Sequence, residues 1–548
     1  MDLSIFGLSD IVLSLKATYL ANFFAMLIVF SAVSIMFVMP KYKLTKSFYA
    51  LYFILTISMF LIVYAGDFLL FFVGWEAMSI STYFLLAQHA SSKTLHKYII
   101  FAMASALSLL SAIVILYSGT KSFLYVDAEA NFLALSEVIR IVFMTLFLFG
   151  IFIKIGVIGF HYWLIDAYEE AHDIFAPYLS AILSKMGVYA LIILVTKVSE
   201  PMFILAIVGV ITSIVATFKA IQEDSLKRLL AYSSIAQVGY IVTVLGVADG
   251  LGGALYHSLV HTAVKLLLFI NVAGVIYMTR RAKFSELGGL IYRMPQSFVL
   301  LLIGIITLAG MPPLGGFSSK FMIYTTLLDT KSLLVLCAVM FSSASAFLYV
   351  YKLVYGIYLG HPTTKRLESV KEVPIAFLIP QYFLAAVIVG LGVVPAIVVP
   401  YFNKILTEAG LKTFEFTNYA TLHTYFSSFN GTVLMSAMAV IFVLVLILFT
   451  RTRSHAVNVE DRFDIAYCGE VPNEGTHLHY GFNIGQELKR VGFISTIIKN
   501  YTKSFYDYLA KQTLLFSDRI KRIYTGKLNI NFNIAIIFVI ILLWWSTK

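Results

Sequence analysis

The sequence predicts an all-α, polytopic membrane protein with about 14 transmembrane helices. Of its 548 residues, 60% are hydrophobic and only 13% are charged, and the mean hydropathy is +0.88. Runs of about 20 apolar residues, the length that crosses a hydrocarbon core of about 30 Å, recur from residue 18 to residue 402 with few breaks. This pattern excludes a soluble enzyme.

The apolar runs define the expected elements in chain order. Their predicted bounds are 18–39, 47–65, 68–88, 97–118, 138–158, 176–197, 202–222, 226–246, 250–279, 296–328, 332–358, 373–402, 430–450 and 530–547. We group them into an N-terminal helix (1–46), a first five-helix repeat (47–197), an inverted second repeat (202–358), additional helices (373–450), a cytoplasmic loop (451–483), a lateral amphipathic helix (484–527) and a C-terminal anchor (530–547). Apolar and basic residues mix at helical spacing in 484–527, which is typical of a helix that lies along a membrane.

Basic residues are distributed unevenly between the loops on the two sides. The loops after the first, third, seventh, ninth and eleventh runs hold most of the loop lysines and arginines. By the positive-inside rule these loops are cytoplasmic, so we expect a multi-pass protein of the cell membrane with its N-terminus outside. We attribute the net charge of +11 to basic residues that orient the protein in the membrane and contact anionic lipid headgroups or acidic partner subunits, and not to nucleic-acid binding.

The chain offers few ligands for a redox cofactor. Its two cysteines, Cys337 and Cys468, exclude an iron–sulfur cluster or zinc site held by cysteines of this chain alone. The sequence also has no flavin or nicotinamide signature. We therefore expect no cofactor on this chain, and the sequence leaves open whether the chain belongs to an enzyme.

Seven ionisable residues inside the predicted helices need an explanation. An ionisable side chain at mid-bilayer costs about 2.5–3.5 kcal/mol on insertion scales. Lys154 lies near the end of its run, so snorkelling alone would be enough to explain its charge. A single buried ion pair with Glu76 would leave three other lysines without a carboxylate. Burial and neighbouring ammonium groups both disfavour the charged form, which makes such lysines able to exchange protons. The candidates are Glu76, Lys154, Lys185, His257, His261, Lys265 and Lys320.

Three of these residues share one helix face. His257, His261 and Lys265 are spaced four residues apart. A lone histidine is usually a hydrogen-bonded core residue, but two histidines stacked above a lysine favour a functional role. A zinc-protease motif is excluded because Ser258, and not glutamate, follows His257.

Two of the predicted helices are interrupted next to a lysine. Gly156 and Gly159 follow Lys154, whereas Pro312 and Pro313 precede Lys320. Helix breaks at membrane depth are tolerated where the freed backbone faces protein or water. Each break falls in the fourth helix of its five-helix group, and because five is odd the second group must be inverted. This architecture is typical of ion-translocating transporters, and ordinary kinks in a scaffold are the alternative.

Six stretches carry a resemblance to a known family. They are DFLLFFVGWEAMSISTYFLL (67–86), KIGVIGFHYWLIDAYEEA (154–171), YLSAILSKMGVYAL (178–191), DSLKRLLAYSSIAQVGY (224–240), HSLVHTAVKLLLF (257–269) and LAGMPPLGGFSSKF (308–321). Through them residues 15–400 resemble the antiporter-like membrane subunits shared by respiratory complex I, Mrp cation/proton antiporters, and membrane-bound hydrogenases and their sulfur-reducing relatives. The resemblance implies a hydrated proton path parallel to the membrane.

The resemblance also implies a role for each candidate. Glu76 matches the glutamate of the "WE" helix, Lys154 its partner in the first broken helix, and Lys185 the central lysine. The other candidates match the second half of the family's path, with Lys320 at its terminal position. Two departures stand out. The WE helix is the third helix here and normally the fifth. Family members often have a proline where this chain has Ile165, and Ala-Pro where it has Ala171–His172.

We therefore expect a proton- or sodium-translocating subunit of a multisubunit redox-driven complex. The segment 484–527, which resembles the family's lateral helix, and YCGE at 467–470 favour the hydrogenase or sulfur-reductase group. Expected partners are other antiporter-like and small membrane subunits, lipids, and a peripheral redox arm that holds iron–sulfur clusters, with nickel–iron in a hydrogenase. The alternatives are an Mrp-type antiporter subunit without redox partners and a mainly structural clamp.

Overall fold

The computed structural model describes residues 2–4, 12–359, 367, 369–451, 490–498 and 501–523. The chain divides into two compact units, Met1–Ile497 and Ile498–Lys548, which we describe separately. The predicted loop 451–483, apart from its first residue, and the predicted anchor 530–547 lie outside the described residues.

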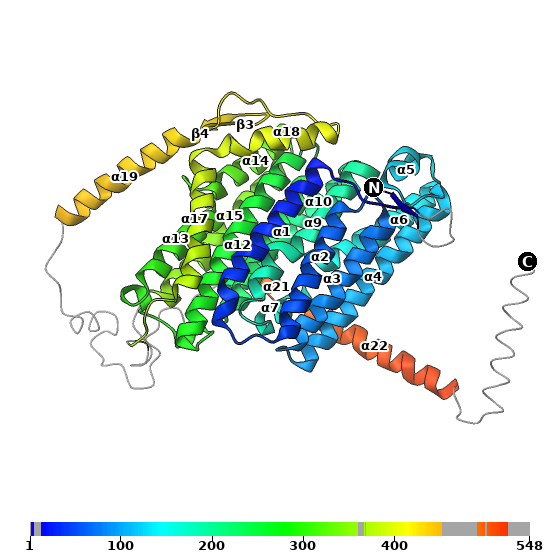
Figure 1. The fold of residues 1–548 in the computed structure, drawn as a ribbon, viewed down its shortest axis with the longest axis horizontal. Coiled ribbons are helices and arrows are strands. Elements are labelled where there is room, and N and C mark those ends of the chain that lie inside the picture. Colours follow the sequence, from blue (N-terminus) through cyan, green and yellow to red (C-terminus); the bar gives the residue numbers. More distant parts are fainter. Residues whose placement is uncertain are drawn as a thin grey trace, which may run out of the picture. The chain divides into compact units, whose positions relative to one another are not determined.

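The first unit is a bundle of apolar helices (Figure 1). Twelve helices among the described residues are long and apolar enough to cross a membrane, which confirms the all-α polytopic fold. The count of 14 and the inverted repeat stay predictions. Eleven spanning helices are α1 (Tyr19–Val38), α2 (Lys46–Tyr64), α3 (Phe68–Ala87), α4 (Ser92–Thr120), α6 (Glu137–Ile155), α10 (Phe203–Gln222), α11 (Leu226–Leu245), α12 (Leu251–Thr279), α15 (Leu333–Ile357), α17 (Ile375–Val393) and α19 (Gly431–Arg451).

The sixth span, Ala176–Val198, is built from four consecutive pieces. They are α8 (Ala176–Tyr178), the π-helical turn η3 (Leu179–Leu183), α9 (Ser184–Ile193) and the π-helical turn η4 (Leu194–Val198). π-helical turns are rare and often occur at functional sites. This irregularity lies next to Lys185, and nothing in the hydropathy pattern indicates it.

Short elements connect the spans. They are β1 (Asp2–Ser4), β2 (Val12–Ser14), η1 (Met39–Lys41), α5 (Tyr125–Asn131), η2 (Phe132–Ala134), α7 (Tyr162–Glu170), η5 (Phe284–Glu286), η6 (Leu290–Tyr292), α13 (Pro295–Ala309), α14 (Gly315–Asp329), η7 (Pro395–Val398), α18 (Val399–Glu408), β3 (Thr421–His423) and β4 (Ser428–Asn430). β1 pairs with β2 and β3 with β4, each antiparallel. α18, β3 and β4 lie together at one end of the bundle (Figure 1).

Side-chain caps fix where many of the helices begin. The side chains of Thr18, Thr45, Asp67, Ser91, Ser136 and Ser225 each accept a hydrogen bond from a backbone N–H in the first turn of the helix that follows. Such caps satisfy amides that have no partner within the helix. Two predicted boundaries differ. α4 begins at Ser92, five residues before the predicted start at 97. The run 373–402 is not one helix, because α17 ends at Val393 and Pro395, which lacks an N–H, starts η7.

The core of the first unit lies in the middle of the bundle. The sixth span, α11 and α12 are almost wholly buried, whereas α2, α4, α6 and α15 each expose an apolar face. A helix that is buried on all sides can carry polar groups that never meet lipid. The three buried spans hold Lys185, Lys265 and both predicted histidines.

The C-terminal helices fall within the predicted amphipathic segment. They are α21 (Gly492–Ile498) and, in the second unit, α22 (Tyr501–Ile523). α22 exposes Phe505, Leu509 and Phe516 in a sequence that also contains Lys503 and Lys511. The helical, amphipathic character agrees with the sequence, and its orientation along a membrane stays a prediction.

Candidate functional site

Six of the seven candidate residues are buried in the first unit. Lys185 and Lys265 have no exposed surface, and Lys154, His257, His261 and Lys320 are at most 4% exposed. Glu76, on α3, is half-buried. Lysines enclosed in this way must find hydrogen-bond partners or exchange their proton, because an unpaired buried charge costs several kcal/mol.

Glu76 and Lys154 interact electrostatically but do not touch. In the described part of the chain no direct ion pair joins them, and the Oε1 atom of Glu76 is buried without a hydrogen-bond partner. The Nζ of Lys154 instead donates to Ser79 Oγ at 3.1 Å, less than one turn along α3 from Glu76, and lies 5.6 Å from the ring centre of Trp75. The predicted ion pair is therefore separated in this structure.

The first helix break follows Lys154 directly. α6 ends at Ile155, and Gly156 and Gly159 both adopt positive φ, 78° and 98°, which favours glycine. The chain resumes as α7, and Trp163 Nε1 donates to the carbonyl of Ile153 at 3.0 Å. Lys154 thus lies in the last turn of α6, beside freed backbone.

The second break places Lys320 against a helix end. α13 ends at Ala309, Gly310 has φ 79°, and Pro312 and Pro313 separate it from α14. The Nζ of Lys320 donates to the carbonyls of Leu308 and Ala309, at 3.1 and 2.9 Å, and to Ser343 Oγ of α15 at 2.7 Å. Lys320 therefore caps the C-terminus of α13 from the far side of the break.

The central lysine follows the π-helical turn η3. The Nζ of Lys185 donates to Ser184 Oγ at 3.3 Å. Lys185 also acts electrostatically on His257, His261 and Lys265, all on α12. The sixth span and α12 thus bring Lys185 near the three candidates on α12.

On α12 the predicted shared face is formed. The rings of His257 and His261 are stacked with centroids 6.1 Å apart, and His257 Nδ1 is 3.1 Å from Ser319 Oγ, the residue before Lys320. Lys265 donates to Ser233 Oγ at 2.6 Å. His257 Nε2 and both ring nitrogens of His261 are buried without a partner in the described chain. Buried polar atoms of this kind are where ordered water binds.

Sequence reasoning missed the hydroxyl groups that hold the lysines. Each buried lysine of the group donates to a serine, and these serines are Ser79, Ser184, Ser233 and Ser343. It also missed His161, which lies buried in the first break with its Nδ1 unpartnered. The sequence does show serines within apolar runs, but which lysine each serine contacts depends on how the helices pack.

Charged residues tie α7 to its neighbours near the break. Arg228 of α11 contacts Asp166 at 3.0 Å, Glu169 at 2.8 Å and Glu223 at 3.0 Å, and Lys97 of α4 also pairs with Asp166. In the loop that follows α7, burial, with His89 beside it, lowers the pKa of His172 to about 4. The ion pairs account for the acidic character of this segment.

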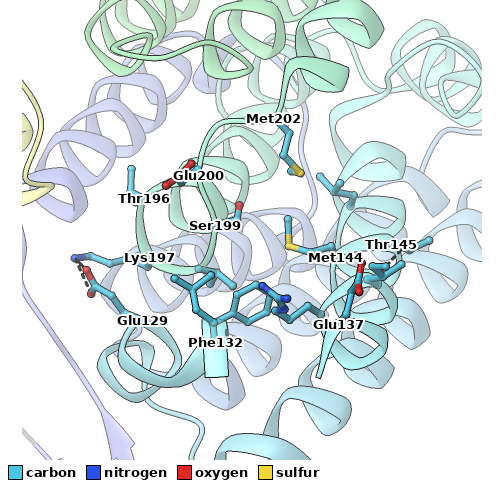
Figure 2. Close-up of a pocket in the computed structure, with 15 residues that line it drawn as sticks. Glu129, Phe132, Glu137, Met144, Thr145, Thr196, Lys197, Ser199, Glu200 and Met202 are labelled. Carbon is cyan, nitrogen blue, oxygen red and sulfur yellow. Dashed lines mark hydrogen bonds and ion pairs between the residues drawn. The ribbon is translucent and has the colours of Figure 1, made fainter. Parts of the chain in front are cut away.

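A separate cavity of about 810 Å³ lies near η2, η4 and the start of α6. Its lining includes the exposed ion pair of Lys197 and Glu129 at 3.1 Å, together with Phe132, Met144 and Met202 (Figure 2). None of the seven candidate residues lines it. The buried group is therefore distinct from this cavity.

Comparisons with known proteins identify similar chains. NADH-quinone oxidoreductase subunit N of Desulfitobacterium hafniense is 27% identical over 393 residues, which cover 66% of this chain and 78% of that protein. Na⁺/H⁺ antiporter subunit A1 of Staphylococcus epidermidis is 28% identical over 396 residues, 66% of this chain and 49% of that protein. This chain thus spans about half the length of that antiporter subunit.

Solved structures show the same fold. A chain of the membrane-bound sulfane sulfur reductase (MBS), an archaeal respiratory membrane complex, superposes with TM-score 0.89 at 25% identity, covering 99% of this chain and 91% of that one. A chain of the Mrp complex from Dietzia sp. DQ12-45-1b gives TM-score 0.77 at 20% identity, covering 100% and 57%. Residues 65–346 match the family described as NADH:quinone oxidoreductase/Mrp antiporter, transmembrane, which is just over half of the chain. The chain is therefore a member of the NADH:quinone oxidoreductase/Mrp antiporter transmembrane family.

Proposed function

We propose that this chain translocates protons or sodium ions within a multisubunit, redox-driven membrane complex. The observation that carries the proposal is the set of four buried lysines whose hydrogen bonds go to hydroxyl and carbonyl oxygens and not to carboxylates. A permanent ammonium held in this way costs several kcal/mol. A lysine that alternates between ammonium and amine avoids part of that cost, and this alternation moves a proton.

The roles follow from the contacts. Glu76 and Lys154 form the switching pair, because they act on each other electrostatically while Lys154 donates to Ser79, so the ammonium has a second acceptor besides the carboxylate. Lys185 passes protons toward α12, and Lys265 and Lys320 continue the path. The two histidines bridge them through bound water, for which their unpartnered ring nitrogens provide donors and acceptors.

A complex of the sulfur-reductase or hydrogenase type is the environment we favour. The MBS chain matches nearly the whole of this chain and of its own length, whereas the Mrp chain is matched over 57% of its length. On this proposal the partners are antiporter-like and small membrane subunits, lipids, and a peripheral arm that holds the iron–sulfur clusters, and nickel–iron in a hydrogenase. The complex lies in the cell membrane, with the N-terminus of this chain outside.

The second candidate is an Mrp-type antiporter subunit without redox partners. It is supported by the similarity to the Na⁺/H⁺ antiporter subunit A1 over 66% of this chain. Mass spectrometry of the native detergent-solubilised complex, with metal analysis, separates the two. Iron and a cluster-bearing partner support the redox-driven complex, and an intact complex without them supports the antiporter.

Replacement of the central lysine tests ion translocation itself. We expect Lys185→Ala to reduce ion transport by the complex in proteoliposomes while its partner subunits still copurify. Lys197→Ala is the control, because Lys197 lies on the same span but is partly exposed and pairs with Glu129. Transport by the Lys185→Ala complex at the wild-type rate would refute the relay.

The clamp alternative has its own test. Deletion of residues 484–548 removes the amphipathic segment and leaves the buried group unchanged. Loss of assembly with normal transport in the remaining complex would assign a clamping role to this segment.

A further inference from the structure

The cavity near η2, η4 and the start of α6 follows one face of α6. It is lined there by Glu137 and by the residues three, four, seven and eleven positions further on, which are Arg140, Ile141, Met144 and Leu148. This spacing places all five side chains on the same side of the helix. From Glu137 to Leu148 an α-helix rises about 16 Å, which is about half of a hydrocarbon core of about 30 Å. The cavity is therefore a groove that extends along α6 over the depth of about one membrane leaflet.

The lining of this groove changes from polar to apolar along α6. Glu137 lies in the first turn of α6, and Arg140 lies about one turn further along the helix. Beyond Arg140 the lining residues of α6 are apolar apart from Thr145, whose hydroxyl donates to the carbonyl of Ile141 at 2.8 Å. The groove thus has a polar end at the start of α6 and a longer apolar part. An amphipathic molecule, with a polar head and an apolar chain, matches this division.

The residues at the edge of the groove are apolar and exposed. Leu133 and Ile141, which line the groove, are 77% and 57% exposed. Phe203, which follows the lining residue Met202 and starts α10, is 53% exposed. Exposed apolar side chains on a membrane-spanning bundle contact acyl chains or another protein. A ligand with an apolar chain can therefore reach the groove from the surrounding lipid.

Among the described residues, one cation and two carboxylates at the polar end have no ion-pair partner. Lys197 and Glu129 pair with each other at 3.1 Å, so their charges cancel. The Nε of Arg140 is buried and has no hydrogen-bond partner in that part of the chain. Glu137 and Glu200 lie on opposite sides of the groove, and neither forms an ion pair with a described residue (Figure 2). A ligand with both an anionic and a cationic group would neutralise these charges, whereas a purely anionic headgroup would face two carboxylates.

We propose that this groove binds one phospholipid whose headgroup carries a phosphate and a primary ammonium, as in phosphatidylethanolamine. The guanidinium of Arg140 binds the phosphate, Glu137 accepts hydrogen bonds from the ammonium, and one acyl chain lies along Ile141, Met144 and Leu148. The order of these residues along α6 matches the order of the groups in the lipid, in which the phosphate lies between the ammonium and the acyl chains. This site goes beyond ion translocation and does not depend on it.

Native mass spectrometry of the intact complex tests whether the groove holds a lipid. The detergent-solubilised complex that contains this chain is delipidated, incubated with phosphatidylethanolamine, and analysed with its bound lipids. Met144→Trp fills the groove, so its complex should bind one phosphatidylethanolamine fewer than the wild-type complex. Met103→Trp is the matched control, because Met103 lies on α4, is 55% exposed and does not line the groove.

Removal of one charge tests recognition of the headgroup. Arg140→Gln should weaken binding of this one phosphatidylethanolamine about tenfold, because a charge-assisted hydrogen bond to the phosphate is lost. Lys121→Gln, which removes an exposed cation at the end of α4 and outside the groove, should leave this binding unchanged. Phosphatidylglycerol, which has no ammonium, should bind to the wild-type groove about tenfold more weakly than phosphatidylethanolamine.

Three results would overturn the proposed site. Equal numbers of bound phosphatidylethanolamine molecules in the wild-type and Met144→Trp complexes would show that the groove holds no lipid. Equal binding of phosphatidylglycerol and phosphatidylethanolamine would show that the carboxylates do not select an ammonium. Loss of a partner subunit from the Met144→Trp complex, with the bound lipid unchanged, would assign the groove to a protein partner.

Discussion

The backbones of α10 and α11 approach so closely at Gly209 that a methyl group cannot fit between them. A Cβ atom at this position would lie 2.4 Å from Thr243 N and 2.6 Å from the carbonyl oxygen of Gly239. Ordinary contacts of a Cβ begin near 3.4 Å, so Gly209→Ala requires the two helices to separate by about 1 Å. Forced repacking of this kind costs about 1–3 kcal/mol. Alanine returns about 0.5–1 kcal/mol through its helix propensity, which leaves a net loss of up to about 2.5 kcal/mol.

Gly390→Ala provides the matched control. Gly390 lies in the last turn of α17, and a Cβ there meets nothing within 4 Å. We expect this variant to be as stable as the wild type or more stable, by up to about 1 kcal/mol. The assay is the unfolding midpoint of the purified protein in one mild detergent. Equal midpoints for Gly209→Ala and Gly390→Ala would show that the α10–α11 contact is not as close as described and would refute the argument.

Two further predictions concern the charged segment around α7. Arg228→Gln leaves three carboxylates without their shared partner, so it should lower the free energy of unfolding by about 1–3 kcal/mol in the same assay. Arg281→Gln is the control: it loses one longer, exposed ion pair and should change the free energy of unfolding by less than about 0.5 kcal/mol. Equal effects of the two substitutions would contradict the network. Because the pKa of His172 is about 4 when folded and near 6.5 when unfolded, the unfolded chain binds this proton first. Stability should therefore fall between pH 7 and pH 4, and less steeply in His172→Gln; parallel pH curves would contradict this.

Much of the fold and of the candidate site could be predicted because both depend on local patterns. An apolar run of sufficient length is a helix in a membrane, and a lysine in the middle of such a run cannot reach the headgroups with its side chain. The glycines and prolines that break α6–α7 and α13–α14 act on their own backbone, so their effect is visible in the sequence. The effect of Pro395 was not visible in this way, because the apolar run continues past Pro395 although α17 ends at Val393.

Most partners of the buried lysines could not be predicted, because they come from distant parts of the chain; the exception is Ser184, the neighbour of Lys185 in the sequence. Ser79 precedes Lys154 by 75 residues, and Ser233 precedes Lys265 by 32. Glu76 was paired with Lys154 from the resemblance alone, whereas the structure gives the hydrogen bond to Ser79. Which side chain fills the space between two helices depends on how each helix is rotated and tilted, and no local sequence pattern determines that rotation or tilt.

The position of a lysine at each helix break has a common physical reason. A helix that ends inside the membrane leaves its last carbonyls unpaired and carries about half a negative charge at that end. Lys154 lies in the last turn of α6, and Lys320 donates to the last carbonyls of α13. Each break therefore places partial negative charge near the ammonium, and the second break also supplies carbonyl acceptors, whereas Lys154 donates to Ser79 Oγ. A carboxylate would pair with the ammonium so strongly that the lysine would keep its proton. Backbone carbonyls stabilise the ammonium less, so the lysine can still give up its proton.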